Sequence, residues 1–353
     1  EGAVALPEVP EAETSCRGQH VRWFRDHDGL WLACERRLLH RSEAWTAHPL
    51  PGFYRGGPVW RSEGGLYLSG ENSELMRRTG EQWLTVQLEG HQEGEVLKDV
   101  LSYLPLPDGS LLVGGARGVH RVDGLQATPV GALRPRVRHL RSDGARVWLG
   151  TLDHGLCVVP LDALDGLVDR CLGPGSTLDR ATIHHTLADG RGRTWVATNQ
   201  GIGVVADAAL ADWADGGSEP AVFWLDRTDG MRSAECNGFM GDAAVQTPDG
   251  HLWFATQDGV VEVDLDQFEL PAPPAARWAS ATVGEAEHVA PDTLELVSDH
   301  APVVLRWTAP VGPWSDQIAF RYRLSDDRPW SEPRHSRRLE LASLPAGPSR
   351  VSV

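Results

Sequence analysis

Polar dipeptides that could bind a ligand recur at one position of a repeated pattern. Each follows an apolar run that contains tryptophan, and each precedes a glycine: Asp153-His154, Asn199-Gln200 and Gln257-Asp258. Carboxylate, amide and imidazole groups are side chains that hydrogen-bond polar ligands. Asn and Asp are also favoured in tight turns for backbone reasons alone. The residue types therefore leave two interpretations open, a ligand-binding rim and a set of turn residues.

Two longer polar segments, residues 179–185 and 232–240, could add to the same rim. Guanidinium, carboxylate and amide groups suit a small polar ligand, either carbohydrate-like or carboxylated. The candidate residues are Arg180, His184, His185, Arg232, Glu235 and Asn237. Each also has a structural interpretation, as a histidine satisfied in the core or as a group that ties down a loop through the backbone. The second segment contains Phe239 and Met240, which we expect to be exposed.

The sequence carries no established catalytic motif. It has no GxSxG elbow, no HExxH pair, no Walker loop and no GxGxxG before a helix, and Gly201-Ile202-Gly203 fits a turn into a strand. Asp153, Glu235 and Asp258 could still converge as the paired carboxylates of a glycosidase, because sequence supplies no distances. We expect a non-catalytic region without a metal or cofactor.

The segments that must position these residues belong to an internal repeat. Its copies centre on Trp31, Tyr67, Leu112, Trp148, Trp195 and Trp253, separated by 36, 45, 36, 47 and 58 residues. These spacings are close to the roughly 40 to 50 residues of a four-stranded propeller blade. The pattern predicts a β-propeller with six visible blades. Residues 3–9 could supply an outer strand that closes the ring, or a missing upstream segment could complete a seventh blade.

Each repeat has the features of an antiparallel blade. An Asp-Gly dipeptide, such as Asp189-Gly190 or Asp249-Gly250, precedes the central aromatic residue and suits a tight hairpin. We interpret the tryptophans as core wedges between neighbouring blades rather than as ligand platforms. With strands named A to D from the axis outward, antiparallel order places the B–C and D–A loops at the same end. That end should therefore gather the candidate residues.

The repeat ends near Asp266, and the following prolines cannot continue a central strand. We predict a propeller domain at residues 1–270 and a second domain at residues 271–353. The second domain has strand-like segments at 293–297, 303–308, 318–324 and 338–341. They predict a small immunoglobulin-like β-sandwich. Because the sequence is still strand-like at Val353, we expect the natural protein to continue.

The charge and the hydropathy of the chain exclude some classes of binding partner. The 353 residues include 33 Lys and Arg against 49 Asp and Glu, a net charge of −16. Such a chain repels a phosphate backbone, so we expect no nucleic-acid partner. No apolar run approaches the roughly 20 residues of a spanning helix, so membrane attachment would need segments outside this chain.

Among five cysteines, Cys157 and Cys171 flank one short segment. They fit either a local disulfide in an oxidising compartment or buried thiols.

The repeat, the segment 233–264 and the stretch after it together resemble the two-component-regulator propeller family, over roughly residues 28 to 353. In that family a triple-tyrosine sandwich domain follows the propeller. Glu235 and Asn237 match its E-x-N motif, and Tyr322, Trp330 and Gly347 match marks of its sandwich. Tyr322 is the one evident member of the eponymous tyrosines. The copies at Trp31 and Tyr67 lack the glycine turn, and the copy at Leu112 lacks the aromatic residue.

The resemblance implies the periplasmic or extracytoplasmic sensor region of a bacterial inner-membrane protein. The inner half of such proteins is a histidine kinase, a hybrid kinase or a diguanylate cyclase. We expect a homodimer that binds a small polar ligand without turning it over. Two alternatives stay open. One is a propeller enzyme, a lyase or a lactonase-like hydrolase that holds a divalent metal through rim Asp, Glu and Asn. The other is a protein-interaction platform.

Overall fold

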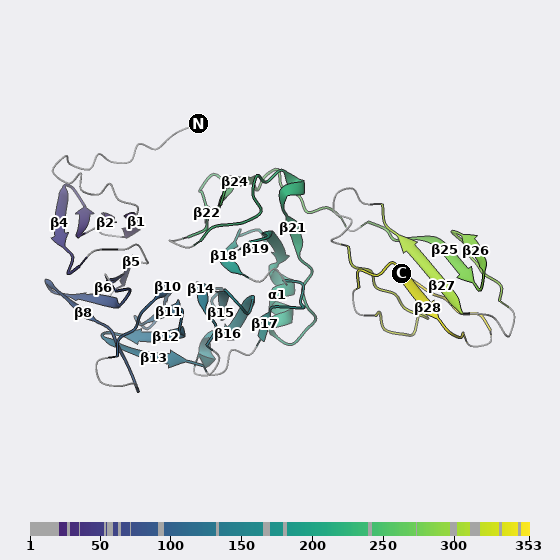
Figure 1. Cartoon of the computed structure of the whole chain (residues 1–353), viewed down its shortest axis with the longest axis horizontal. Coiled ribbons are helices and arrows are strands. Elements are labelled where there is room, and N and C mark those ends of the chain that lie inside the picture. The colour runs from purple at the N-terminus through teal and green to yellow at the C-terminus, as the bar shows by residue number, and fades with distance from the viewer. Residues whose placement is uncertain are drawn as a thin grey trace. The chain divides into compact units, whose positions relative to one another are not determined.

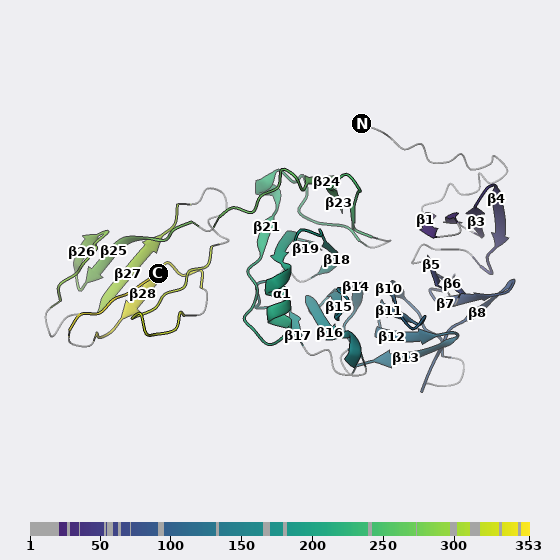
Figure 2. The same cartoon turned by 180° about the vertical axis from the view of Figure 1, so that it is seen from behind.

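The chain divides into two compact units, Glu1–Phe268 and Glu269–Val353, which are drawn in Figures 1 and 2. The computed structural model describes residues 21–26, 29–34, 36–52, 54, 59–62, 65–70, 72–90, 95–131, 134–164, 170–178, 182–238, 242–272, 274–296, 302–310, 318–331, 334–344 and 347–353. Several residues singled out in the sequence lie outside these ranges, namely 3–9, Arg180, Phe239 and Met240. That the two units fold as independent domains stays a prediction.

The described residues of the first unit form six antiparallel sheets, one for each copy of the repeat. Sheet 1 contains β1 (Val21–Asp26), β2 (Gly29–Cys34), β3 (Arg37–Arg41) and β4 (Trp45–Pro49). Sheet 2 contains β5 (Val59–Ser62), β6 (Gly65–Ser69), β7 (Leu75–Thr79) and β8 (Gln82–Thr85). Sheet 3 contains β10 (Val100–Pro105), β11 (Leu111–Gly115), β12 (Gly118–Asp123) and β13 (Gln126–Val130), with β9 (Gln87–Leu88) parallel to β13.

The other three sheets follow the same strand order. Sheet 4 contains β14 (Val137–Ser142), β15 (Arg146–Thr151), β16 (Leu156–Pro160) and β17 (Arg170–Leu172). Sheet 5 contains β18 (Ile183–Ala188), β19 (Arg193–Thr198), β20 (Gly201–Ala206) and β21 (Phe223–Leu225). Sheet 6 contains β22 (Ala244–Gln246), β23 (His251–Thr256) and β24 (Gly259–Asp264).

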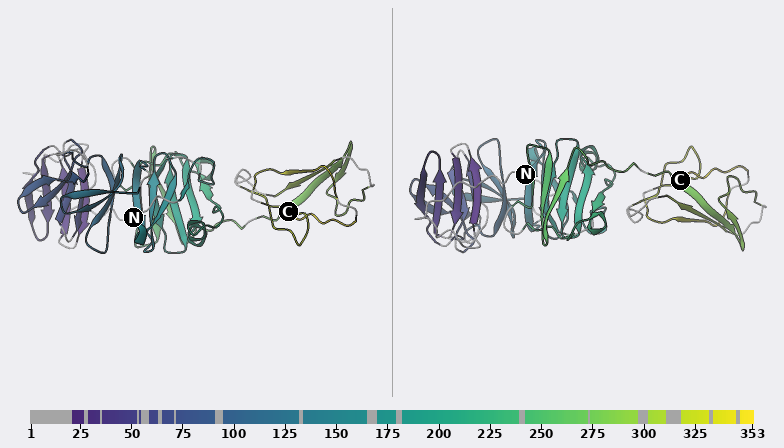
Figure 3. Two further views of the ribbon diagram at one scale, coloured as in Figure 1. Left: turned by 90° about the horizontal axis from the view of Figure 1, so that it is seen from below. Right: turned by 90° about the horizontal axis from the view of Figure 1, so that it is seen from above.

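The first strand of each sheet lies innermost. These strands contact one another in sequence order, β1 with β5, β10 with β14, β14 with β18, and β18 with β22. Figure 1 looks along the axis that they surround, and Figure 3 shows from the side that the strands run parallel to this axis. This is the radial arrangement of a β-propeller. The predicted all-β propeller fold is confirmed.

Three tryptophans of the repeat, Trp31, Trp148 and Trp195, are wedges between sheets, as predicted, whereas Trp253 of sheet 6 is only half-buried. Trp148 of sheet 4 packs with Val196 and Val205 of sheet 5, and Trp195 of sheet 5 packs with Leu252 and Phe254 of sheet 6. Both indoles are buried. Each contact removes a large apolar ring from water, so it joins consecutive sheets that share little backbone hydrogen bonding.

A short helix lies in the connection between β20 and β21 of sheet 5, and the repeat pattern did not predict it. Helix α1 (Asp207–Ala214) follows β20, and two single 3₁₀ turns, η2 (Leu161–Ala163) and η3 (Arg227–Asp229), lie in other connections. Leu210 and Trp213 of the helix are buried, and Trp213 stacks on Trp148 with ring centroids 6.4 Å apart. The helix accounts for part of the long spacing of 58 residues between the last two copies.

The second unit contains one four-stranded sheet in the order β26-β25-β27-β28 among its described residues. Its strands are β25 (Arg277–Val283), β26 (Ala286–Val289), β27 (Val303–Thr308) and β28 (Arg338–Leu341). The core includes Trp307, Ala309 and Phe320, with Tyr322 packed against it. Two of the four predicted strands are correct, at 303–308 and 338–341. The others are wrong: residues 293–296 form no strand, and 318–324 makes only single bridges at Phe320 and Arg323.

Two cysteines of sheet 4 are covalently joined. Cys157 on β16 lies opposite Cys171 on β17, and the two form a disulfide. Cys236 is a free, buried thiol. Of the two possibilities left open by the sequence, the local disulfide is therefore the one observed. No helix in the described ranges is long and apolar enough to cross a membrane.

Candidate functional site

The candidate turns lie at one end of the propeller, called here the turn end. Asp153-His154, Asn199-Gln200 and Gln257-Asp258 occupy the connections β15–β16, β19–β20 and β23–β24. The innermost strands begin at this same end, because Val137 pairs with Thr151 and Ile183 with Thr198. The structure thus places the B–C turns and the D–A connections at the same end, as the antiparallel order predicted.

Asp153 is held by its own sheet. Its carboxylate accepts a hydrogen bond from Arg136 Nε at 3.3 Å and contacts His154 Nδ1 at 2.8 Å. Burial acts to raise the pKa of Asp153, but the hydrogen bonds from His154 and Arg136 outweigh it and lower this pKa below 3.8. These contacts give Asp153 and His154 a structural role in joining a B–C turn to the adjacent D–A connection.

Glu235 and Asn237 tie the start of sheet 6 to the second strand of the same sheet and to the turn that follows it. Gln257 N donates to Glu235 O at 2.9 Å, and Asn237 N donates to Ala255 O at 2.9 Å. The side chains of Gln257 and Glu235 also meet, at 3.5 Å. The structure therefore brings Glu235, Asn237 and Gln257 together, with backbone bonds as the main link. Arg232, Gln200 and Asp258 are exposed.

Three innermost strands carry a β-bulge at the same place, which the sequence analysis missed. Pairing skips one residue between Val100 and Ser102, between Val137 and His139, and between Ile183 and His185. The skipped residues are Leu101, Arg138 and His184. A bulge redirects its extra residue out of the ladder. The sequence carries a weak indication of these bulges, because each strand begins with a β-branched apolar residue followed by the skipped one. The aligned segments are Val-Leu-Ser-Tyr, Val-Arg-His-Leu and Ile-His-His-Thr.

Sheet 6 has a longer insertion at the equivalent position. In sheet 6, Cys236 bridges to Thr256 and Ala244 pairs with Phe254. The equivalent pairs in sheet 5 are Ile183 with Thr198 and Thr186 with Val196. Seven residues of the sequence, 237–243, therefore separate the two paired positions in sheet 6, against two in sheet 5. A Cβ atom on Gly238 would lie 3.0 Å from His184 Cβ, so the backbone at Gly238 lies directly against the histidine. Gly238, which belongs to the predicted segment 232–240, and His184 thus meet at the turn end.

His184 is a polar group without a partner. Both ring nitrogens are shielded from solvent, and neither has a hydrogen-bond partner in the described part of the chain. Burial, and after it the positive charge of Arg138, lower the pKa of His184 to about 4. The imidazole is therefore neutral at pH 7, with one donor and one acceptor nitrogen. Asn199 Oδ1, in the adjacent turn of the same sheet, is also buried and lacks a partner among the described residues.

His185 has a structural role instead. It lies in strand β18 and not in a D–A loop as predicted, and its ring packs on His139 of β14 with centroids 3.9 Å apart. Burial lowers the pKa of His185 to about 4, whereas the negative charge of Asp242 opposes this shift. His139 Nε2 lies 3.0 Å from Thr186 O. The histidine pair joins sheets 4 and 5 beside the bulge.

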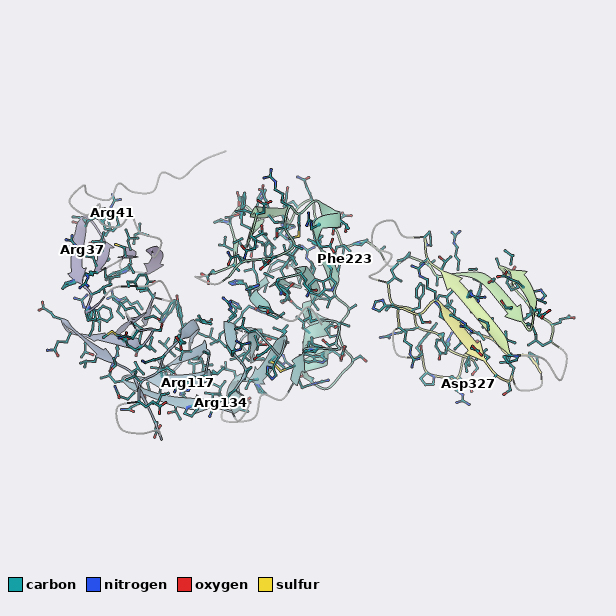
Figure 4. The ribbon with its side chains drawn as sticks, in the orientation of Figure 1. Arg37, Arg41, Arg117, Arg134, Phe223 and Asp327 are labelled. Carbon is teal, nitrogen blue, oxygen red and sulfur yellow. A yellow bond between two sulfur atoms is a disulfide. The ribbon has the colours of Figure 1, made fainter. Side chains whose placement is uncertain are left out.

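The turn end also carries arginines that the sequence analysis did not single out. Arg117 belongs to the turn between β11 and β12, and exposed Arg134 precedes β14; Figure 4 labels both side chains. Arg117 forms an ion pair with Glu95 at 2.5 Å. Sheets 3 and 4 therefore present cationic groups at the end where His184 lies. Within the described ranges, no group of three or more His, Cys, Asp or Glu side chains is arranged to hold a metal ion.

Sequence comparisons identify no relative: no protein-family model matches the chain, and no curated protein matches it. Solved structures do resemble it. They include the extracellular domain of BT4673 from B. thetaiotaomicron, described as a one-component system, with TM-score 0.48, 11% identity and coverage of 96% of this chain and 54% of that chain. A second structure, of the hybrid two-component system BT4673, has TM-score 0.41, 12% identity and coverage of 96% and 55%.

A third similar structure is PorZ, a surface component of the type-IX secretion system of Porphyromonas gingivalis. It has TM-score 0.47 and 14% identity, with coverage of 82% of this chain and 49% of that chain. This chain spans about half the length of the BT4673 and PorZ structures that it resembles.

Proposed function

We propose that this chain is the extracytoplasmic ligand-sensing region of a membrane-bound two-component or cyclic-dinucleotide signalling receptor. It binds a small polar ligand at the turn end of the propeller and is not itself catalytic. Segments outside this chain supply the membrane attachment and the output domain. The resemblance of the propeller repeats and the following segment to two-component-regulator propellers supports this role.

The observation that carries the ligand site is the unpartnered imidazole of His184. Buried polar groups in proteins almost always have a hydrogen-bond partner, because a buried donor or acceptor without a hydrogen bond costs about 1–3 kcal/mol of stability. A neutral histidine presents one donor and one acceptor, and a hydroxyl group satisfies either. The free acceptor of Asn199 requires a donor as well. A hydroxyl-rich ligand of the carbohydrate class can hydrogen-bond His184 Nδ1, His184 Nε2 and Asn199 Oδ1. The positive charge of Arg138, which acts on His184, suits a carboxylate on the same ligand.

The disulfide between Cys157 and Cys171 supports an extracytoplasmic location. Disulfides persist in secreted and periplasmic proteins and are rare in the reducing cytosol. The contact between Gly238 and His184 supports a sensing role, because a ligand that binds His184 also meets the backbone at the start of sheet 6. A ligand that binds one arrangement of these two residues more tightly than another shifts the balance between the arrangements.

The site is tested with a panel of neutral sugars, uronic acids and polyols, first by thermal shift and then by calorimetry. We expect a bound compound whose affinity falls about tenfold or more in His184→Phe, which keeps the ring volume but removes both nitrogens. His154→Phe is the matched control at the same end, and it should bind normally. Binding lost in His154→Phe but kept in His184→Phe would place the site on the rim. Turnover of the bound compound would contradict the non-catalytic role.

A further inference from the structure

A pocket of about 200 Å³ lies beside sheet 4, at the end of the propeller opposite the turn end. The residues around it come from sheet 4 and from the C-terminal end of helix α1. Its apolar part is formed by Ala145, Val158, Pro160 and Ala214, and its charged part by Arg146, Arg170 and Asp215. A cavity of about 150 Å³ can hold benzene, so this pocket has room for a ligand with one ring.

Arg146 brings hydrogen-bond donors to this pocket. Its side chain is only 20% exposed, its Nη2 donates to Asp215 Oδ1 at 2.5 Å, and its Nη1 lies 3.9 Å from Asp143 Oδ2. A guanidinium carries five N–H donors in one plane. Within the described ranges, the bond to Asp215 is the one hydrogen bond that this guanidinium makes. Arg146 therefore keeps donors that a second acceptor group can use.

Arg170 is fixed in place by the end of helix α1. Its guanidinium donates to Trp213 O and, at 3.4 Å, to Gly217 O, and it lies 4.9 Å from the centre of the Trp213 ring. Its charge thus offsets the negative end of the helix dipole. These two bonds use two of the five N–H donors, so Arg170 also keeps donors for a ligand.

Asp215 is the one acidic side chain in the lining of the pocket. Its side chain is 68% exposed, and in the part of the chain that the structure describes its carboxylate is paired with Arg146 alone. Exposed ion pairs contribute little to stability, because solvent screens them. Another carboxylate can therefore replace Asp215 on Arg146 at little cost.

The other acidic groups nearby do not line the pocket. The carboxylate of Asp143 accepts hydrogen bonds from Trp148 Nε1 at 2.8 Å and from the backbone N–H of Ala145 at 2.9 Å. Asp162 and Asp212 are exposed on η2 and α1. The lining itself carries two positive charges against one negative charge, so it favours an anion although the whole chain is acidic.

We propose that this pocket binds a small organic carboxylate with one apolar ring, and that the carboxylate of the ligand competes with Asp215 for Arg146. Guanidinium and carboxylate groups form strong paired hydrogen bonds, and Arg170 supplies further donors on the same pocket. The ring of the ligand packs against Val158 and Pro160. This site lies at the opposite end of the propeller from His184, so it does not depend on the proposed function.

The test is a titration of the whole chain with 4-fluorobenzoate up to about 20 mM, followed by fluorine NMR. We expect saturable binding, and 4-fluorobenzyl alcohol, which lacks the charge, should bind about tenfold more weakly or worse. Asp215→Asn should tighten the binding of 4-fluorobenzoate about fivefold, because it removes the competing carboxylate. Asp292→Asn is the matched control for net charge. It changes an exposed residue of the second unit and should leave the affinity unchanged.

Two further variants locate the site. Arg146→Gln should weaken the binding of 4-fluorobenzoate about tenfold or more. Ala145→Leu keeps every charge and fills the pocket, so it should weaken binding even if Arg146→Gln does not fold, and circular dichroism checks the fold of both. The proposal is overturned if neither the wild type nor Asp215→Asn binds the probe. It is also overturned if the alcohol binds as well as the carboxylate, or if all the variants bind equally, since the probe then binds elsewhere.

Discussion

The carboxylate of Asp189 accepts a hydrogen bond from the indole Nε1 of Trp195 at 3.0 Å. The same carboxylate accepts from Arg193 Nε at 2.6 Å and from the backbone N–H of Arg191 at 2.8 Å. Sheet 4 repeats the contact, with Trp148 Nε1 donating to Asp143 at 2.8 Å. The aspartate of the Asp-Gly hairpin therefore both shapes the turn and orients the tryptophan that packs against the next sheet.

This contact predicts that Asp189→Asn destabilises the propeller by about 3 kcal/mol, because an amide replaces the buried charge and turns its N–H groups toward existing donors. Asp249→Asn is the matched control. It changes the corresponding hairpin of sheet 6, where Asp249 is exposed, and should cost less than about 1 kcal/mol. Urea unfolding followed by tryptophan fluorescence measures both. Equal losses would show that Asp189 acts only as a turn residue.

Acid sensitivity should come from the buried histidine pair His139 and His185, together with His184, whose pKa burial also lowers to about 4. Burial, and then the neighbouring His185, lower the pKa of His139 well below 6.5, and the pKa of His185 is lowered to about 4. The unfolded chain therefore takes up protons first as the pH falls. Stability is full above about pH 6.5 and declines from there toward about pH 4, by about 1.4 kcal/mol per pH unit for each histidine.

The measurement is the urea midpoint of unfolding between pH 7 and pH 4.5. His139→Gln removes one titrating group and should flatten this dependence relative to the wild type. His335→Gln changes an exposed histidine of the second unit and should leave the slope unchanged. A wild-type midpoint that does not fall over this range would contradict neutral burial of the pair.

Much of the propeller was predictable because its signals are local and repeated. Asp-Gly turns mark five of the six copies of the repeat and central tryptophans mark four, and the turns at Asn199-Gln200 and Gln257-Asp258 lie where antiparallel order requires. The bulge at His184 was missed because one extra residue leaves the apolar pattern on either side almost intact. The alternation of apolar and polar residues also does not show whether a segment has a neighbouring strand to pair with. For this reason 293–297 was predicted as a strand and 277–283 was not.

The disulfide between Cys157 and Cys171 should stabilise sheet 4. It closes a loop with a sequence separation of 14 residues, and a loop of about this length is worth about 3 kcal/mol in the chain-entropy account. The double variant Cys157→Ala, Cys171→Ala should lower the unfolding free energy by about this amount. A reducing agent should then have a smaller effect on the variant than on the wild type. An unchanged stability of the double variant would show that the bond adds nothing to the packing of β16 on β17.

Substitutions at Gly155 and Gly190 should show how much of the cost of adding a Cβ atom comes from backbone strain and how much from steric contact. Gly155 and Gly190 both have φ of +71°. A Cβ atom on Gly155 would lie 1.9 Å from Leu172 O, whereas one on Gly190 would have no atom within 4 Å. Gly190→Ala should therefore cost only about 1 kcal/mol for the left-handed conformation.

Gly155→Ala must in addition move the backbone of β17 away from the turn, and we expect it to destabilise the protein by several times as much as Gly190→Ala. Urea unfolding of the two variants gives the comparison directly. Because Gly155 closes the turn that holds Asp153 and His154, the same substitution should also displace those side chains from Arg136. Equal costs at the two glycines would mean that β17 yields freely at this point, and that the turn end of sheet 4 is not held in place by its outer strand.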